Sequence, residues 1–434
     1  MTIKTRSSRH ARTIRLASVG LALASTFALA ACSTAGTPGG TTSGSASDAA
    51  DAASITAVFL SGGAYDPCSE AYATEFQQKY GTKVNVIHEG YPTLHDKLLT
   101  ALSSGATSYD VMMIAYQWTG EFSPFLTDLT KPVAANSSLK NVIASATDSY
   151  KVGSKQYAVP FSAQAETMFY RTDLFDKAGL KAPTTWAQWE KDVNFFTNNP
   201  DYPGVYGTSI KASDSNSESE FNSRYYGLGG KSLGSEGSKI DTKIAAQALT
   251  LLKNDVTKSP AGARSATFAE TGAQFKSGIV AMGEFQPTTV LSLINATTAD
   301  NKVLGKVAVT TLPGGHGEMG GWGLAVPKSS ANQATATKFA QFLSTESADH
   351  DCFVKDGKSP VQNATYTASD VSKLYYTKGI KDALESSLPR PSGANGGKIN
   401  TMMTTVIGQF LAGQISSADD AAKQMANQYN LLVK

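Results

Sequence analysis

Short apolar segments alternate with longer mixed segments along most of the chain. Residues 54–59 are β-branched and aromatic, residues 68–80 form a helix-like stretch that ends at Gly81, and residues 83–88 form a second strand-like run. This order predicts a strand, a helix and a strand, with residues 60–67 as the first loop. Such a unit favours a parallel sheet with a right-handed crossover.

The same alternation continues toward the carboxyl end. Residues 110–115 (DVMMIA) are almost wholly apolar, which is typical of a central strand buried on both faces. Further strands are predicted at residues 279–285, 307–313 and 323–326, and helices at residues 91–104, 241–253, 268–278, 332–344, 399–411 and 417–432. The body of the chain is therefore predicted to be α/β.

The first 31 residues differ from this pattern. A basic start without acidic residues precedes the apolar run 16–31, which is too short and too polar for a membrane-spanning helix and indicates an export signal. Leu29-Ala30-Ala31-Cys32 matches a lipobox, so we expect Cys32 to carry the lipid of a mature lipoprotein. The alternative is an ordinary secretory signal cut near Ala31. Residues 32–53 are rich in Gly, Ser, Thr and Ala and predict a flexible tether.

Charge and length narrow the class of protein. Residues 1–31 hold five of the 38 basic residues and none of the 36 acidic ones, so the mature chain has a formal charge of −3. This balance gives no sign of a basic patch for nucleic acid or acidic lipid. The roughly 380 residues beyond the tether exceed what one hydrophobic core usually holds, which predicts two lobes.

The predicted sheet brings polar and aromatic side chains to one edge. Tyr65 and Asp66 lie in the first loop, and Tyr116, Gln117 and Trp118 follow the buried strand at 110–115. Ligands of parallel sheets gather beyond the carboxyl ends of the strands. Aromatic rings stack on sugar C–H surfaces while amides and acids bond sugar hydroxyls, so these residues are ligand candidates. For Trp118 the alternative is packing under the next helix.

An ordered series of signals spans residues 153–191. A polar turn at Gly153 precedes a strand at 156–160, a second strand at 167–171 and a short helix at 173–178 that stops at Gly179. Pro183-Thr184-Thr185-Trp186 then starts another helix with Thr185 as its N-cap.

This series resembles the signature of the extracellular solute-binding proteins of ABC importers, in the sugar-binding branch that contains maltose-binding protein. Ser154 is inserted between the usual glycine and lysine, and Arg171 stands where the family has asparagine. The resemblance implies a two-lobed periplasmic-binding-protein-like α/β fold with a hinge, each lobe a mainly parallel sheet flanked by helices. It implies lobe 1 at residues 54–163 and 325–370, and lobe 2 at residues 164–324 and 371–434.

The resemblance also extends the set of ligand candidates. It places Gln164 on the first passage between lobes, Glu284 and Gln286 after the strand at 279–285, and Trp322 in a glycine-rich second passage. Arg390 falls in the family's last ligand loop, and Asn222 and Tyr225 are expected on the cleft side of lobe 2.

Cysteine usage fits an exported protein. Apart from Cys32, only Cys68 and Cys352 are present, and the family's chain path places both in lobe 1. A disulfide is expected, with two buried free thiols as the alternative.

The function expected is a lipid-anchored, extracytoplasmic, monomeric subunit that captures a sugar or oligosaccharide and delivers it to the transmembrane permease subunits of an ABC importer. No cofactor, metal or nucleic acid is expected. The alternatives are a non-sugar solute (polyamine, peptide or phosphorylated compound) or, less favoured, a secreted carbohydrate-active hydrolase. The chain has no G-x-S-x-G or H-E-x-x-H motif, and its five histidines lack metal-ligand spacing. A hydrolase needs only two carboxylates, which sequence spacing cannot exclude.

Overall fold

The computed structural model describes residues 51–433 except 214–215 and 234–237. The predicted export signal, the lipobox with Cys32 and residues 32–50 of the predicted tether lie outside the described residues. No helix in the described part of the chain is long and apolar enough to cross a bilayer.

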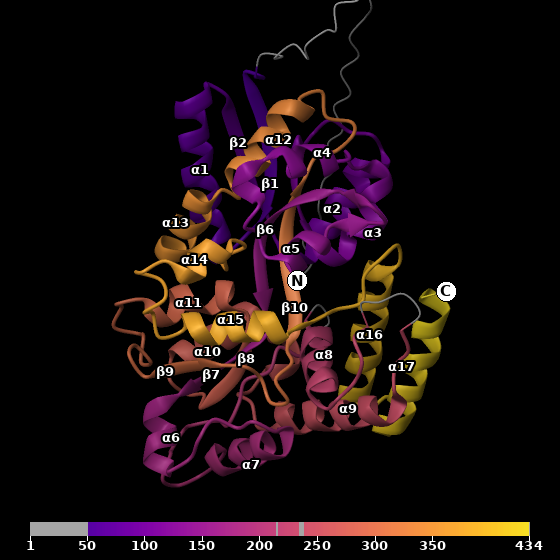
Figure 1. Cartoon of the computed structure of the whole chain (residues 1–434). Helices are drawn as coiled ribbons and strands as arrows, with labels where there is room; N and C mark the ends of the chain where they lie inside the picture. Colours follow the sequence, from indigo (N-terminus) through magenta and orange to yellow (C-terminus); the bar gives the residue numbers. More distant parts are fainter. Residues whose placement is uncertain (1–50, 214–215, 234–237, 434) are drawn as a thin grey trace, which may run out of the picture. The chain divides into compact units, whose positions relative to one another are not determined.

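The first sheet contains the predicted strand–helix–strand unit (Figure 1). Strands β1 (Ser54–Leu60), β2 (Lys83–Glu89) and β3 (Val111–Ala115) pair in parallel, with β1 in the middle. Every residue of β3 is buried, as its apolar run predicts. Helix α1 (Tyr65–Tyr80) connects β1 to β2 and ends on Gly81 in the left-handed conformation that glycine adopts easily.

Two long strands run from the first sheet toward the second. Strands β6 (Ala158–Ala165) and β10 (Glu318–Ala325) pair antiparallel from end to end, with an irregularity at Trp322/Gly323, and β10 also pairs with β3. The sequence placed these strands at residues 156–160 and 323–326, so both are longer than predicted. The sequence placed residues 314–322 in a glycine-rich passage before the strand, whereas β10 already begins at Glu318.

Close packing explains the glycines of β10. A Cβ atom on Gly321 would lie 2.9 Å from the carbonyl oxygen of Ser162, and one on Gly323 would lie 2.7 Å from the ring of Tyr150. Both distances are shorter than real Cβ contacts, so these positions are glycine because neighbours lie against the backbone.

The second sheet is antiparallel in its named strands. Strand β7 (Thr167–Arg171) lies between β8 (Met282–Phe285) and β9 (Val307–Thr310). The expectation of a mainly parallel sheet is therefore correct for β1, β2 and β3 but wrong here. A strand that pairs in parallel with β7 would need a crossover connection that brings the chain back in the same direction. Strands β8 and β9 instead run opposite to β7. The predicted strand 167–171 and its following helix, α6 (Thr172–Ala178), are confirmed.

Helices surround both sheets. Near the first sheet lie α2 (Tyr91–Ser103), α3 (Thr119–Phe122), α4 (Thr130–Ala135), α5 (Ala144–Asp148), α12 (Gln333–Phe342), α13 (Glu346–Asp356) and α14 (Asn363–Thr367). Toward the second sheet and beyond it lie α7 (Trp186–Phe196), α8 (Ser217–Gly227), α9 (Thr242–Thr257), α10 (Phe268–Lys276), α11 (Pro287–Asn295), α15 (Thr377–Ser386), α16 (Gly396–Leu411) and α17 (Ala418–Leu432). The predicted N-cap of α7 is confirmed, because Thr185 and Gln188 form a capping box.

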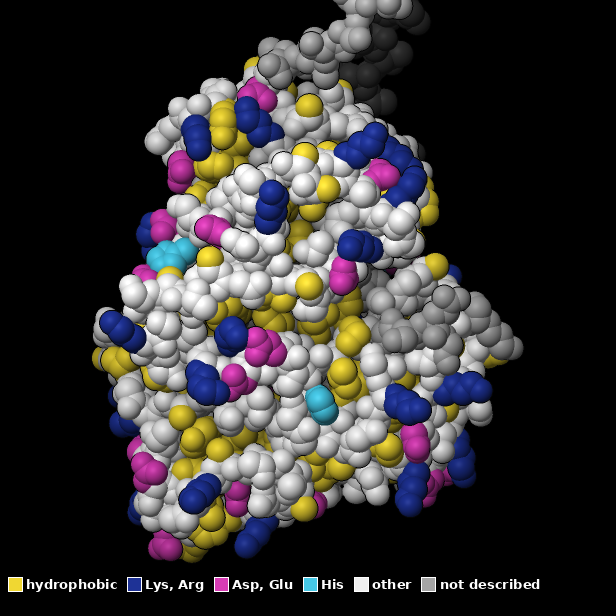
Figure 2. All heavy atoms as spheres, in the orientation of Figure 1, with side chains coloured by type: hydrophobic (Ala, Val, Ile, Leu, Met, Phe, Trp, Pro, Cys, Tyr) yellow, Lys and Arg dark blue, Asp and Glu magenta, His cyan; other side chains and the backbone are white. Residues whose placement is uncertain are grey.

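The surface carries mixed charge. Figure 2 shows lysine and arginine side chains interspersed with aspartate and glutamate over the visible face.

A disulfide joins α1 to α13. The Sγ atoms of Cys68 and Cys352 are 2.03 Å apart, and the two cysteines are 284 positions apart in the chain. The bond ties the first turns of α1 to a helix that belongs to a much later part of the sequence.

A cluster of six buried charged residues lies beside the second sheet, and we name it the ion cluster. It consists of Lys211, Arg224, Glu166, Glu220, Glu284 and Asp255. Lys211 lies 3.2 Å from Glu166 and 2.9 Å from Glu220. Buried charges persist only when they are paired in this way, because desolvation of each charge is costly.

Two carboxylates of the ion cluster are shifted in opposite directions. Burial opposes ionisation of Glu220, but Lys211 and Arg224 lower its pKa to about 2. Burial, together with the neighbouring charge of Glu220, raises the pKa of Glu284 well above its usual value. The ion cluster therefore opposes ionisation of Glu284 and favours ionisation of Glu220.

Replacing Glu284 by glutamine should change how stability depends on pH. Because the pKa of Glu284 is higher in the folded state than its usual value of 4.5, Glu284 stabilises the folded state fully at a pH below 4.5. This contribution to stability is lost as the pH rises through the folded-state pKa. Glutamine resembles the protonated acid at every pH. The Tm of E284Q should therefore match the wild type near pH ~5 and exceed it increasingly up to pH ~8 in calorimetry.

Glu220→Gln is the matched control. It removes the anion between two cations and should lower the Tm at neutral pH. A difference between E284Q and the wild type that stays constant from pH ~5 to ~8 would contradict a raised pKa of Glu284.

Loss of the disulfide should destabilise the folded state. Because it closes a long loop, the variants C68S, C352S and C68S/C352S should each lose about 2–5 kcal/mol of unfolding free energy in urea titrations. The three losses should be equal, since each variant removes the same bond. Maleimide labelling of denatured, unreduced protein should leave Cys68 and Cys352 unmodified. Labelling at both positions would show that the bond does not form.

Candidate functional site

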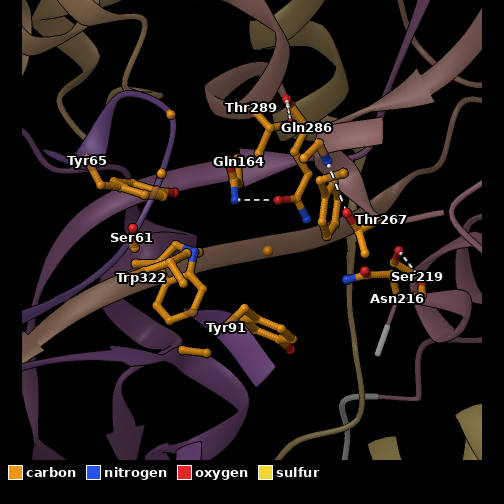
Figure 3. A pocket seen from close by; sticks show the side chains of 18 of the residues that line it. Ser61, Tyr65, Tyr91, Gln164, Asn216, Ser219, Thr267, Gln286, Thr289 and Trp322 are labelled. Atoms are coloured by element: carbon orange, nitrogen blue, oxygen red, sulfur yellow. Dashed lines mark hydrogen bonds between the residues drawn. The ribbon is translucent and has the colours of Figure 1, made fainter. Parts of the chain in front are cut away.

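One cavity of about 530 Å³ is lined by residues from both sides of the β6–β10 pair. Its lining combines aromatic, amide, hydroxyl and charged side chains with several small residues (Figure 3). The lining residues are Leu60, Ser61, Gly62, Gly63, Tyr65, Tyr91, Ala115, Gln117, Gln164, Asn216, Glu218, Ser219, Thr267, Phe268, Ala269, Ala273, Gln286, Thr289, Ser292, Leu293, Gly320, Gly321, Trp322 and Arg390. This volume is within the range of small-molecule sites.

Three aromatic rings form one wall of the cavity. The ring of Trp322, on β10, meets the ring of Tyr65 edge-on at 6.3 Å and that of Tyr91 at 6.1 Å, centroid to centroid. Trp118 does not line the cavity but supports this wall, since its ring lies 5.6 Å from Trp322 in an edge-on arrangement. These edge-on contacts hold Trp322, which is itself largely buried, in place at the cavity.

Two amide side chains lie at the ends of strands β6 and β8. The Nε2 of Gln164 donates to the Oε1 of Gln286 at 2.9 Å, as Figure 3 shows. The Nε2 of Gln286 in turn donates to the Oε1 of Glu166 at 3.0 Å. Both amides are therefore held in one orientation by the surrounding protein.

A carboxylate and a guanidinium complete the lining. Arg390 forms an ion pair with Glu318, which is not part of the lining. The Nη1 of Arg390 is also 3.9 Å from the Oε2 of Glu218. The Nδ2 of Asn222 donates to Glu318 at 2.6 Å. Burial raises the pKa of Glu318 to about 8, although the charge of Arg390 favours its ionised form. The charges that reach the cavity are thus opposite in sign and neutralise each other.

Half of the twelve ligand candidates from the sequence line this cavity. They are Tyr65, Gln117, Gln164, Gln286, Trp322 and Arg390. The structure brings these residues together although they are spread over more than three hundred positions of the chain. The other six candidates, Asp66, Tyr116, Trp118, Asn222, Tyr225 and Glu284, do not belong to its lining.

Three of these six support the site from the first sheet. Helix α1 begins at Tyr65 rather than at residue 68, and the Oδ1 of Asp66 in its first turn accepts from the backbone N–H of Gly62 at 2.9 Å. The hydroxyl of Tyr116 donates to the carbonyl of Met319 at 2.9 Å. Trp118 packs against the rings of Tyr91 and Phe122, in agreement with the alternative prediction that it packs under the next helix.

The other three are buried beside the second sheet. Tyr225 stacks on Phe221 in the core of α8 and α9, and its hydroxyl accepts from the backbone N–H of Asp241 at 2.8 Å. Asn222 holds Glu318, and Glu284 lies 3.1 Å from Arg224 in the ion cluster. These contacts hold all three side chains outside the lining, although the Oδ1 of Asn222 and the Oε1 of Glu284 have no hydrogen-bond partner in the described structure. Ligand contact by these residues stays a prediction.

Several lining residues were missed by the sequence. Tyr91 follows the carboxyl end of β2, so the sheet-edge rule that found Tyr65 could have found it. Among the other missed side chains, Asn216, Glu218 and Ser219 come from the start of α8 and Thr267 and Phe268 from the start of α10. Thr289, Ser292 and Leu293 come from α11. No local pattern marks those helix starts as part of a cavity.

Comparisons with known proteins agree with this architecture. Residues 69–349 match the family model described as bacterial extracellular solute-binding protein. A protein of Deinococcus radiodurans, described as a probable ABC transporter-binding protein, is 25% identical over 368 residues, covering 78% of this chain and 83% of the relative. The mannitol-binding protein of Pseudomonas aeruginosa is 37% identical over 79 residues, 18% of each chain.

Solved structures show the same fold. A maltose-bound MalE3 structure from T. maritima has a TM-score of 0.80 at 24% identity, and the match covers 88% of this chain and all of that one. A ribitol complex of a solute-binding protein from Agrobacterium radiobacter K84 has a TM-score of 0.79 at 22% identity, covering 88% and 99%. The two-domain periplasmic-binding-protein-like fold expected from residues 153–191 is therefore confirmed, and the chain belongs to the family of bacterial extracellular solute-binding proteins.

Proposed function

We propose that this chain is the substrate-binding subunit of an ABC importer that takes a sugar, oligosaccharide or sugar alcohol into the cavity between its two domains. The observation that carries the proposal is the wall of Trp322, Tyr65 and Tyr91 facing amide and charged groups in a cavity of about 530 Å³. Rings of this kind stack on sugar C–H surfaces while the polar groups bond hydroxyls.

The balance of charge supports a neutral ligand. Glu218 and Arg390 lie close to each other and are the ionisable acid and base of the described lining. A polyamine would place its positive charge close to that of Arg390. A phosphorylated compound would place its negative charge close to that of Glu218. A neutral polyol can bond both groups without that penalty.

The cavity also favours binding over hydrolysis. Glycoside hydrolases use a pair of carboxyl groups on either side of the scissile bond. Among the described lining residues, Glu218 is the one carboxylate. We propose that the protein changes nothing in its ligand and hands it to the transmembrane permease subunits of the importer.

The anchoring and the domain limits belong to the same proposal. A lipid on Cys32 and a tether at residues 32–53 would hold a monomeric binding body outside the cell membrane. The two domains would comprise residues 54–163 with 325–370, and residues 164–324 with 371–434. These segments would close on the ligand about the strands that join them.

A ligand screen tests the proposal directly. Mono-, di- and oligosaccharides together with mannitol and ribitol should include at least one compound that raises the Tm, since a ligand at 100 times its Kd adds ~2.7 kcal/mol of stability. The same compound should be recovered unchanged after incubation. Shifts with peptides, polyamines or phosphates alone would overturn the sugar assignment, and turnover would overturn the binding function.

Substitution of Trp322 tests the place of binding. W322A removes the central ring of the aromatic wall and should weaken the ligand found in the screen at least about tenfold in calorimetric titrations. F195A is the control, because Phe195 lies exposed on α7 outside the described lining. Equal affinity of W322A and F195A would place the ligand elsewhere.

A further inference from the structure

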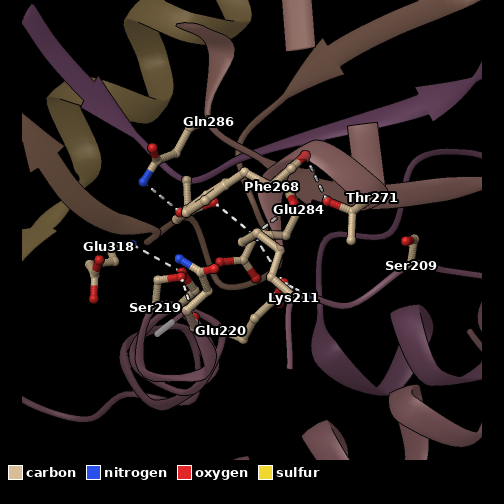
Figure 4. Close-up of polar contacts among 12 residues, drawn as sticks. Ser209, Lys211, Ser219, Glu220, Phe268, Thr271, Glu284, Gln286 and Glu318 are labelled. Carbon is tan, nitrogen blue, oxygen red and sulfur yellow. Dashed lines mark hydrogen bonds and ion pairs between the residues drawn. The ribbon is translucent and has the colours of Figure 1, made fainter. Parts of the chain in front are cut away.

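A chain of polar contacts leads from the ion cluster to the cavity. The Nζ of Lys211 lies 3.2 Å from the Oε2 of Glu166, and the Oε1 of Glu166 accepts from the Nε2 of Gln286 at 3.0 Å. The Oε1 of Gln286 accepts from the Nε2 of Gln164 at 2.9 Å. Figure 4 labels Lys211 and Gln286, and Figure 3 shows the contact between Gln286 and Gln164 at the cavity. We name these four residues the relay.

The members of the relay differ in their access to a ligand. Gln164 and Gln286 line the cavity, whereas Glu166 and Lys211 do not. All four are buried, with exposed fractions of 0% for Lys211, 1% for Glu166, 2% for Gln164 and 9% for Gln286. Among the four members, the two amides are therefore the ones placed to contact a ligand.

The carboxylate of Glu166 sets the direction of the whole relay. An amide group is nearly symmetric in shape, and its oxygen and nitrogen can exchange places by a half-turn. An ionised carboxylate can only accept hydrogen bonds, so Gln286 must present its NH₂ group to Glu166. The oxygen of Gln286 then faces Gln164, which must present its own NH₂ group in turn.

Lys211 keeps Glu166 in the accepting state. Its ammonium group contacts Glu166 and Glu220 and also donates to the backbone carbonyl of Glu284 at 2.9 Å. These three partners use all three of its hydrogens, so the cation is fixed against Glu166. Burial raises the pKa of Glu166, and the charge of Lys211 opposes that shift. The ion cluster thus acts as a rigid support for the amides at the cavity.

This direction determines what Gln164 has left to offer. One N–H of its NH₂ group donates to Gln286, and its Oε1 is buried without a hydrogen-bond partner in the described structure. A buried carbonyl oxygen without a partner is costly, and a donor that reaches it is favoured.

We propose that Glu166 is a positioning residue that fixes the amide orientation of Gln286 and Gln164 and so makes Gln164 an acceptor for a ligand hydroxyl. The orientation of the amides stands on the contacts alone, and the hydroxyl rests on the proposed function. The relay explains why an acidic residue directly follows β6 in a stretch that otherwise has no charged residue from Ala158 to Tyr170.

A double-mutant cycle in the full chain without ligand tests the contact. Q286E sets two carboxylates against each other and should lower the Tm strongly, while E166Q should lower it mildly. In E166Q/Q286E the amide and the carboxylate have exchanged places, so the new amide at position 166 can donate to the new carboxylate at position 286. Most of the loss should therefore be recovered. Additive losses would overturn the relay.

The orientation of the amides is read by NMR of their side-chain NH₂ groups. In the wild type, the Gln286 NH₂ signals should be shifted downfield and exchange slowly with solvent, and E166Q should move the signals of both Gln286 and Gln164. The control D192N removes another buried carboxylate, on α7, and should leave both sets of signals in place. Unchanged signals in E166Q would show that Glu166 does not orient the amides.

Measuring ligand affinity distinguishes a positioning role of Glu166 from a purely structural one. The strongest binder among maltose, mannitol and ribitol should bind E166Q at least threefold more weakly than the wild type and D192N with unchanged affinity. Equal affinity for E166Q would overturn the ligand step of the proposal. If none of the three compounds binds the wild type, the hydroxyl step fails with the proposed function, while the cycle and the NMR signals still decide the orientation of the amides.

Discussion

The pairing of β6 with β10 is the constraint on which the rest of the structure depends. These two strands belong to the first sheet, and their far ends lead directly into the second domain through Glu166 and Glu318. Trp322 and Gln164 lie on this pair, so the cavity has one rigid wall whose residues are fixed by strand hydrogen bonds. The close approach of Ser162 and Tyr150 to β10 explains why glycine occupies positions 321 and 323.

Buried charge organises the side of the cavity that belongs to the second domain. The ion cluster compensates its own desolvation by pairing, and Arg390 with Glu218 and Glu318 does the same at the cavity itself. Because these groups satisfy one another, the cavity presents little net charge. The aromatic wall on the other side supplies apolar surface. Together the two sides match a ligand that is neutral, rich in hydroxyls and partly apolar.

The sequence predicted elements well where the pattern was local. The apolar run at 110–115 gave a buried strand, and Thr185 and Gly179 gave helix ends that the structure confirms. It failed where the answer depended on distant neighbours. The sequence began this strand only at Gly323, because the residues that pack against the glycines of β10 lie more than 150 positions away. Likewise, Tyr225 and Trp322 are both aromatic and polar-edged, but only tertiary packing places one in a core and the other on a cavity.

The central claim is that a polyol ligand occupies the cavity between the two domains against Trp322. The most direct test is a crystal structure grown with the sugar or sugar alcohol that stabilises the protein most. The account predicts density for a ring or polyol chain lying on Trp322, with hydroxyls within hydrogen-bond distance of Gln117, Glu218 or Arg390. Density for the ligand at another surface, with this cavity holding only water, would contradict it.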